Sequence, residues 1–202
     1  PLPEQSHVTY EAAVTVMMRI VFLLFAEERG LLPSGELFEH GYGISSELDR
    51  LTSLSAAGEE ALEATSLTWH RLLATGKALH RGATFENMRM PAYGGSLFDP
   101  ERFGFLAATT DEGSLAITVS DRAMLHVLRS VQIASVKGEA RRISFRDIDV
   151  EQIGYIYEGL LGYTCRTVAE TYLGLIGKLG VEPEIPLSVL DRILTTHPDH
   201  KA

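Results

Sequence analysis

The stretch from Ala12 to Ala26 is apolar except for Thr15 and Arg19. A helix formed by this stretch is apolar on nearly every face, so it is either a membrane span or the buried centre of a helical bundle. A membrane span needs about 17 to 25 apolar residues, whereas this run is shorter and carries an arginine in its middle. We therefore predict that residues 10–29 form a helix buried inside the protein, and that the other elements pack around it.

The end of this helix is marked by three residues. Gly30 suits the left-handed backbone position just past a helix, and Pro33 prevents the helix from continuing. We expect Leu31 to fold back on the last turn.

The charged residues of this helix need partners. Glu27 and Glu28 lie in the last turn, where the helix dipole disfavours negative charge by about 0.3 to 1 kcal/mol, so we predict cationic partners for them. Neighbouring helical side chains point about 100° apart, which favours structural ion pairing over a metal or acid–base site. We expect Arg19 to be buried or half-buried and paired with an acidic side chain, preferably from the segment that carries Tyr157 and Glu158, because an unpaired buried charge is costly.

The composition is that of an ordinary globular protein, and the 202 residues are enough for one large domain or two small ones. We expect a single helical domain over 1–202, and a fragment of a larger multidomain protein. The lone Cys165 and the absence of a signal peptide pattern in residues 1–9 fit a cytoplasmic location, with no membrane partner.

The net charge of −9 is unevenly distributed. Residues 1–63 carry −8 and residues 147–202 carry −5, whereas residues 64–146 carry +4. An acidic chain is a poor candidate for the main grip on nucleic acid, because DNA affinity comes largely from neutralised phosphates. The positive middle remains a candidate for lying beside DNA, and its densest cluster is Lys137, Arg141, Arg142 and Arg146. The alternative is a solvated basic turn that balances the acidic flanks.

Hydrophobic spacing predicts a mainly α fold, an irregular helical bundle with minor β structure near 115–119, 142–146 and 165–176. Further helices are expected over 58–80, with Trp69 as a core anchor, and after Asp99, after Ser120 or Asp121, after Asp149 and after Ser188. The helix after Asp149 should bury Ile153, Ile156, Tyr157, Leu160 and Leu161. Residues 92–99 should form an ordered loop that turns at Gly94 and Gly95.

No catalytic motif is recognisable. The histidines lack the spacing of a zinc-hydrolase helix, no serine lies in a nucleophile elbow, and there is no phosphate-binding loop. The sequence therefore predicts no catalytic, cofactor-binding or metal-binding residue in this chain.

Three stretches nevertheless carry a resemblance. They are RIVFLLFAEERGLLP (19–33), PAYGGSLFDP (91–100) and VEQIGYIYEGLLGY (150–163). In this order they resemble the helical region that precedes the catalytic domain in large adenine-specific DNA methyltransferases of restriction–modification and phage-defence systems. The motif residues that carry the resemblance are Arg19, Glu27, Glu28, Arg29, Tyr93, Gly94, Gly95, Phe98, Tyr157 and Glu158.

The resemblance implies a non-catalytic spacer or scaffold of a bacterial methyltransferase. The parent enzyme would transfer a methyl group from S-adenosylmethionine to adenine in DNA, and the partner would be the methylase domain of the same polypeptide, with DNA as a candidate second partner. The family's cofactor loop, its Asn/Asp-Pro-Pro-Tyr motif and the nuclease motif of some members do not occur here. The alternative is a free-standing helical interaction domain without enzyme activity.

Overall fold

The computed structural model describes all residues except 1, 4, 164, 166, 179–182 and 197–202. The chain divides into two compact units, residues 1–164 and residues 165–202, and each is described by itself. Helices dominate, and the strands among the described residues pair only as two-stranded antiparallel sheets. The predicted mainly α fold with minor β structure is confirmed.

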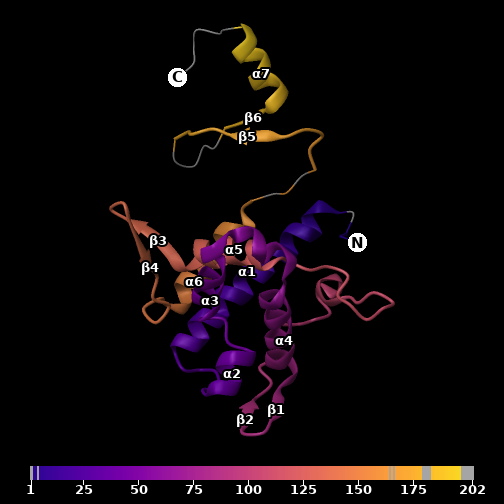
Figure 1. Ribbon diagram of the computed structural model, residues 1–202, viewed down its shortest axis with the longest axis vertical. Helices are drawn as coiled ribbons and strands as arrows, with labels where there is room; N and C mark the ends of the chain where they lie inside the picture. Colours follow the sequence, from indigo (N-terminus) through magenta and orange to yellow (C-terminus); the bar gives the residue numbers. More distant parts are fainter. Residues whose placement is uncertain (1, 4, 164, 166, 179–182, 197–202) are drawn as a thin grey trace. The chain divides into compact units, whose positions relative to one another are not determined.

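The predicted central helix is α1 (Ser6–Glu28), which runs through the middle of the first unit (Figure 1). Its buried residues include nearly the whole run from Met18 to Ala26, on all faces of the helix. By length and mean hydropathy α1 also passes as a membrane span, but more than half of its most apolar stretch is buried by the rest of the protein. This burial agrees with the prediction of a core helix.

The helix α1 ends as predicted, with Gly30 in the left-handed region and backbone hydrogen bonds closing the last turn. Gly30 has a φ of 65°, its amide donates to the Glu27 carbonyl, and the Leu31 amide donates to the Ala26 carbonyl. The expectation for Leu31 is wrong, because its side chain is largely exposed and Leu32 enters the core instead.

Further helical elements of the first unit lie between α1 and the second hairpin. They are α2 (Glu36–Gly41), α3 (Glu47–Leu54), the 3-10 segments η1 (Ser55–Ala57) and η2 (Glu59–Ala64), α4 (Leu67–Arg81) and α5 (Asp121–Gln132), with the first hairpin and η3 (Gly104–Ala107) between the last two. The predicted helix over 58–80 is wrong at its start, because Gly58 has a φ of 130° and Thr65 is extended, so the α-helix begins only at Leu67. Trp69 is buried in α4, as predicted.

The helix expected after Asp99 is only the short 3-10 turn η3. Arg19 donates to the carbonyl of Asp99, and the Asp99 carboxylate accepts the amide of Glu101. The Asp99–Glu101 bond is compatible with a helix start, but Arg19 occupies the Asp99 carbonyl, which would accept the first backbone hydrogen bond of an α-helix beginning there.

Two hairpins project from the first unit (Figure 1). They are β1 (Ala83–Phe85) with β2 (Met88–Met90), and β3 (Ile133–Val136) with β4 (Glu139–Arg142). The turn of the second hairpin is Lys137–Gly138, both with positive φ as a two-residue hairpin turn of this type requires.

The strands predicted at 115–119 and 142–146 are mostly wrong. Leu115 makes an isolated bridge with Thr109, and β4 ends at Arg142. The Ile143 amide donates to the Gln132 carbonyl, but the amides of residues 145 and 146 donate to the Glu28 carboxylate and therefore cannot continue a strand ladder.

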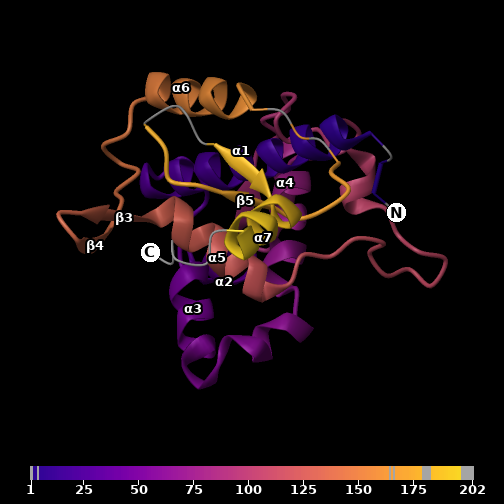
Figure 2. The ribbon, with the colours of Figure 1, turned by 90° about the horizontal axis from the view of Figure 1, so that it is seen from above.

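The helix α6 (Val150–Leu161) begins at Asp149, whose amide donates to the Gln152 side chain. The predicted buried face is wrong, because no residue of α6 is buried. The helix lies along α1 and is covered on one side only (Figure 2), so Ile153 and Tyr157 are half-buried while Ile156 and Leu161 are more than 40% exposed.

The second unit contains β5 (Tyr172–Gly174), β6 (Glu184–Pro186) and α7 (Leu187–Thr196). The strand predicted over 165–176 covers only 172–174 and pairs with 184–186; residue 166 of that range lies outside the described residues. The predicted final helix is present, and the amide of Ser188 in its first turn donates to the Glu170 carboxylate.

Candidate functional site

The two acidic residues at the end of α1 each hold a distant loop by its backbone. The Glu27 carboxylate accepts the amides of residues 44 and 45, at 2.7 and 3.0 Å. The Glu28 carboxylate accepts the amides of residues 145 and 146, at 2.9 and 3.0 Å. The predicted cationic partners are therefore wrong as the main contacts: peptide N–H groups supply the positive charge.

Arg29 also holds backbone. Its guanidinium donates to the carbonyl of Ile148 at 3.0 Å and lies over the ring of Phe25, 4.9 Å from the centroid. The loop between β4 and α6 is thus attached to the end of α1 by two adjacent residues, Glu28 and Arg29.

Arg19 is 6% exposed, which confirms the predicted burial. Its predicted acidic partner is wrong: Nε donates to the carbonyl of Leu97 at 2.7 Å and Nη2 to the carbonyl of Asp99 at 3.3 Å. Burial lowers the pKa of Arg19, the charge of Arg102 lowers it further, and the carboxylate of Asp99 partly opposes both. Among the described residues, no carboxylate oxygen comes within ion-pair distance of this guanidinium.

The second motif stretch is an ordered loop, as predicted, and it contacts both α1 and the residues that follow it. The Tyr93 hydroxyl donates to the carbonyl of Leu31 at 2.9 Å. The glycines at 94–95 both have positive φ, which lets the backbone turn there. Phe98 is buried and meets Phe22 edge to face, with ring centroids 5.4 Å apart.

The third motif stretch forms α6. The Tyr10 hydroxyl of α1 donates to the carbonyl of Leu160, and Tyr157 is half-buried. Glu158 is exposed and makes no hydrogen bond or ion pair with the part of the chain that the structure describes. The three stretches that carry the resemblance, far apart in the sequence, therefore all meet on α1.

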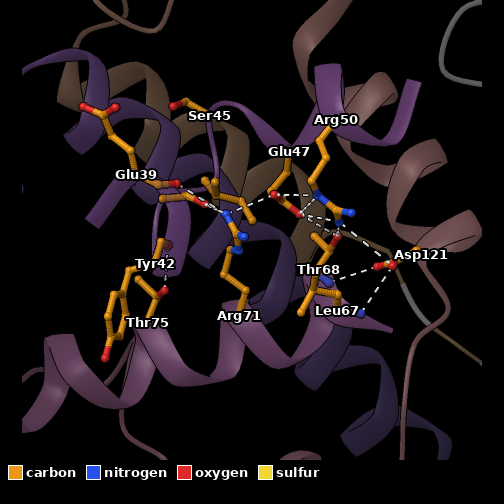
Figure 3. Close-up of polar contacts among 12 residues, drawn as sticks. Glu39, Tyr42, Ser45, Glu47, Arg50, Leu67, Thr68, Arg71, Thr75 and Asp121 are labelled. Carbon is orange, nitrogen blue, oxygen red and sulfur yellow. Dashed lines mark hydrogen bonds and ion pairs between the residues drawn. The ribbon is translucent and has the colours of Figure 1, made fainter. Parts of the chain in front are cut away.

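A buried polar network, shown in Figure 3, was not found by sequence reasoning. Its centre is Glu47, only 1% exposed, whose carboxylate lies 2.8 Å from Arg50 Nη2 and 3.0 Å from Arg71 Nη1. The Thr68 hydroxyl donates to the same carboxylate at 2.8 Å. The only local signal in the sequence is the spacing of Glu47 and Arg50 by three residues, which is also typical of a solvated helix surface.

Asp121 extends this network to the start of α4. Its carboxylate accepts the amides of Leu67 and Thr68, at 3.3 and 2.9 Å, so a residue of α5 caps the N-terminus of another helix. Burial by itself raises the pKa of Asp121, but hydrogen bonds from Thr68 and Thr65 and the charge of Arg50 outweigh it and hold the pKa below its ordinary value. The hydrogen bond to Glu47 raises the pKa of Arg50 despite its burial.

The four basic candidates for DNA contact divide into two pairs. Arg142 bonds to Asp49 at 2.8 Å, to the carbonyl of Ser45 at 2.8 Å and to Gln132 at 2.9 Å. The Arg146 amide donates to the Glu28 carboxylate, and its guanidinium donates to the backbone carbonyl of Glu28 at 3.4 Å. Arg142 and Arg146 thus take part in contacts within the protein.

Lys137 and Arg141 lie outward on the β3–β4 hairpin. Lys137 is an exposed residue of the turn, and Arg141 has a 65% exposed side chain whose ion pair, at 3.1 Å, is with the equally exposed Glu139. The structure thus places two of the four predicted cations where a large anionic partner can reach them.

No group of three or more His, Cys, Asp or Glu side chains capable of holding a metal occurs among the described residues. The carboxylates of the buried network and of the end of α1 accept hydrogen bonds from arginine, threonine or backbone N–H groups. Comparisons with family models, with curated proteins and with solved structures found no match to this chain.

Proposed function

We propose that this chain is a non-catalytic helical scaffold of a bacterial restriction–modification DNA methyltransferase. The parent enzyme would transfer a methyl group from S-adenosylmethionine to adenine in DNA, by chemistry located outside these 202 residues. The scaffold would brace the methylase domain of the same polypeptide.

The observation that carries the proposal is the way the three motif stretches meet on α1. Arg19, Glu27, Glu28 and Arg29 of the first stretch all bond to backbone groups of other segments. Polar groups in such contacts fix the positions of loops. A brace needs loops that are held in fixed positions, so this pattern of residues suits a brace. The motif residues are therefore structural in this proposal, and none of them is assigned a chemical step.

Two experiments test the scaffold role. Calorimetric titration of the chain with S-adenosylmethionine should give no saturable heat at micromolar cofactor, and saturable binding would contradict the proposal. The reading frame downstream of Ala202 should also encode an Asn-Pro-Pro-Tyr motif.

The DNA contact assigned to this scaffold comes from Lys137 and Arg141. In the full-length enzyme, Lys137→Ala/Arg141→Ala should reduce the slope of log affinity against log salt by about two, because two phosphate contacts are lost. Arg81→Ala/Arg89→Ala removes the same charge from exposed sites near the other hairpin and should leave the slope unchanged. Equal slopes for all three proteins would remove the hairpin from the DNA path and leave the brace alone.

A free-standing interaction domain is the second candidate, and one observation favours it. The outer side of α6 exposes apolar residues, among them Val150, Tyr155 and Ile156. A stop codon shortly after Ala202 in the intact gene would support this candidate against the scaffold.

A further inference from the structure

A cavity of about 230 Å³ lies in the first unit, between α1, α4 and the chain from Phe98 to Ala107. Its lining contains three basic side chains, Arg19, His70 and Lys77, and no aspartate or glutamate. Its other lining residues are apolar or glycine. We propose that this cavity binds a small carboxylate with a compact apolar body, an activity that does not depend on the proposed scaffold role.

Arg19 is a buried cation without an ion-pair partner among the described residues. Its Nε and Nη2 donate to two backbone carbonyls, and within the described residues Nη1 has no hydrogen-bond acceptor. A buried cation that is neutralised only by carbonyl dipoles has lost most of its hydration without gaining a counter-charge. Arg102 adds repulsion, in keeping with the lowered pKa of Arg19. An anion at Nη1 would supply the missing charge and the missing acceptor together.

The face of α4 that lines the cavity fits the same ligand. His70, Leu73, Ala74 and Lys77 follow the spacing of a single helical stripe and all line the cavity. Lys77 is exposed, so its ammonium group is available at the solvent side, where it would attract an anion. The cationic groups of α1 and α4 thus line one space.

The apolar lining decides against a bare inorganic anion. Phe98, Phe103 and Leu106 are buried residues whose side chains border the space, and Leu73 is half-buried beside them. Phosphate or sulfate would leave this surface without a partner, whereas a short hydrocarbon or a single aromatic ring would cover it. A carboxylate on such a body matches both parts of the lining.

Benzoate is the probe, and benzamide, of nearly the same shape without the charge, is its control. Calorimetric titration of the 202-residue protein should give saturable binding of benzoate and at least tenfold weaker binding of benzamide. Lys77→Met should weaken benzoate several-fold, while the matched Arg81→Met, one turn further along α4 and outside the lining, should leave it unchanged. Leu73→Trp, which fills the cavity without removing a charge, should abolish binding.

Three results would overturn the assignment. They are an absence of saturable binding at millimolar benzoate, equal affinity for benzoate and benzamide, and displacement of benzoate by inorganic phosphate at equal concentration. The third would show a site for charge alone. None of these results bears on the reading frame or the salt slope that test the scaffold.

Discussion

Replacing Glu47 by glutamine tests whether the buried polar network holds the first unit together. The Glu47 carboxylate is shared by Arg50 and Arg71, at 2.8 and 3.0 Å, and it also accepts the hydroxyl of Thr68; Asp121 lies 4.0 Å from Arg50. The amide keeps the size of the side chain but removes the charge and turns an NH₂ group toward donors. Arg71 then loses its carboxylate partner, while Arg50 keeps that of Asp121 at the longer distance of 4.0 Å.

The size of the loss follows from burial. Breaking a buried ion pair by removing one partner costs about 3 to 5 kcal/mol. The side chain of Arg50 is 29% exposed and that of Arg71 is 10% exposed, so water recovers part of the hydration of Arg50. We therefore expect Glu47→Gln to lower the free energy of unfolding by about 3 kcal/mol, the low end of that range.

Urea unfolding followed by fluorescence measures this loss directly, because Trp69 is the single tryptophan and is buried in α4 next to Thr68. With a slope of about 2 to 3 kcal/mol per molar urea, the midpoint should fall by about 1 M or slightly more. Glu63→Gln is the matched control, since its ion pair with Arg122 is exposed and should be worth less than about 1 kcal/mol. A loss for Glu47→Gln no larger than that of the control would refute the reasoning.

Three further substitutions test other buried or half-buried charges. Arg19→Met should destabilise by about 1 to 3 kcal/mol in urea unfolding, because it strands two carbonyls and no carboxylate; a loss above that of Glu47→Gln would reveal a missed counter-charge. Glu28→Ala should speed hydrogen exchange of the amides at 145–146 and leave those at 44–45, held by Glu27, protected; equal exchange rates at both loops would contradict the separate anchors. The pKa of Asp121 is lowered, so the ionised carboxylate stabilises the fold above about pH 4, and this stabilisation is lost as the pH falls through the lowered pKa. Asp121→Asn should therefore flatten the pH dependence of the urea midpoint in this acid range. An unchanged pH dependence would exclude this role.

The sequence predicted those elements that are determined by residues close to one another in the chain. The apolar run around Ile20, Gly30 past the helix end and the capping pair Asp149 and Gln152 all appear as expected. The predictions were wrong where side chains from distant parts of the sequence bond to the backbone groups of a segment. The helix after Asp99 is interrupted by Arg19, 80 residues earlier, and the strand after Arg142 is ended by Glu28, 117 residues before Phe145.

The same cause explains what could be predicted of the candidate site. The burial of Arg19 follows from its apolar neighbours in the sequence. Its partners, however, are backbone carbonyls, and because every residue has one, the sequence does not show which of them Arg19 contacts. The Glu47 network escaped notice because Arg71 comes from another helix. A basic cluster is visible in the sequence, yet only the fold separates Arg142, which is ion-paired, from Lys137, which is exposed.

At the acidic end of α1, the cost of placing Glu27 and Glu28 against the helix dipole is opposed by the hydrogen bonds that their carboxylates accept. Placing Glu27 and Glu28 in the last turn costs about 0.3 to 1 kcal/mol against the helix dipole. Each carboxylate accepts two backbone amides from a distant loop, and a hydrogen bond to a charged group contributes about 1.5 to 3 kcal/mol. The gain from the loop contacts therefore exceeds the dipole cost at both positions. Acidic residues at this end of the helix are explained by the path of two loops, without any chemical step, which is what a scaffold requires of them.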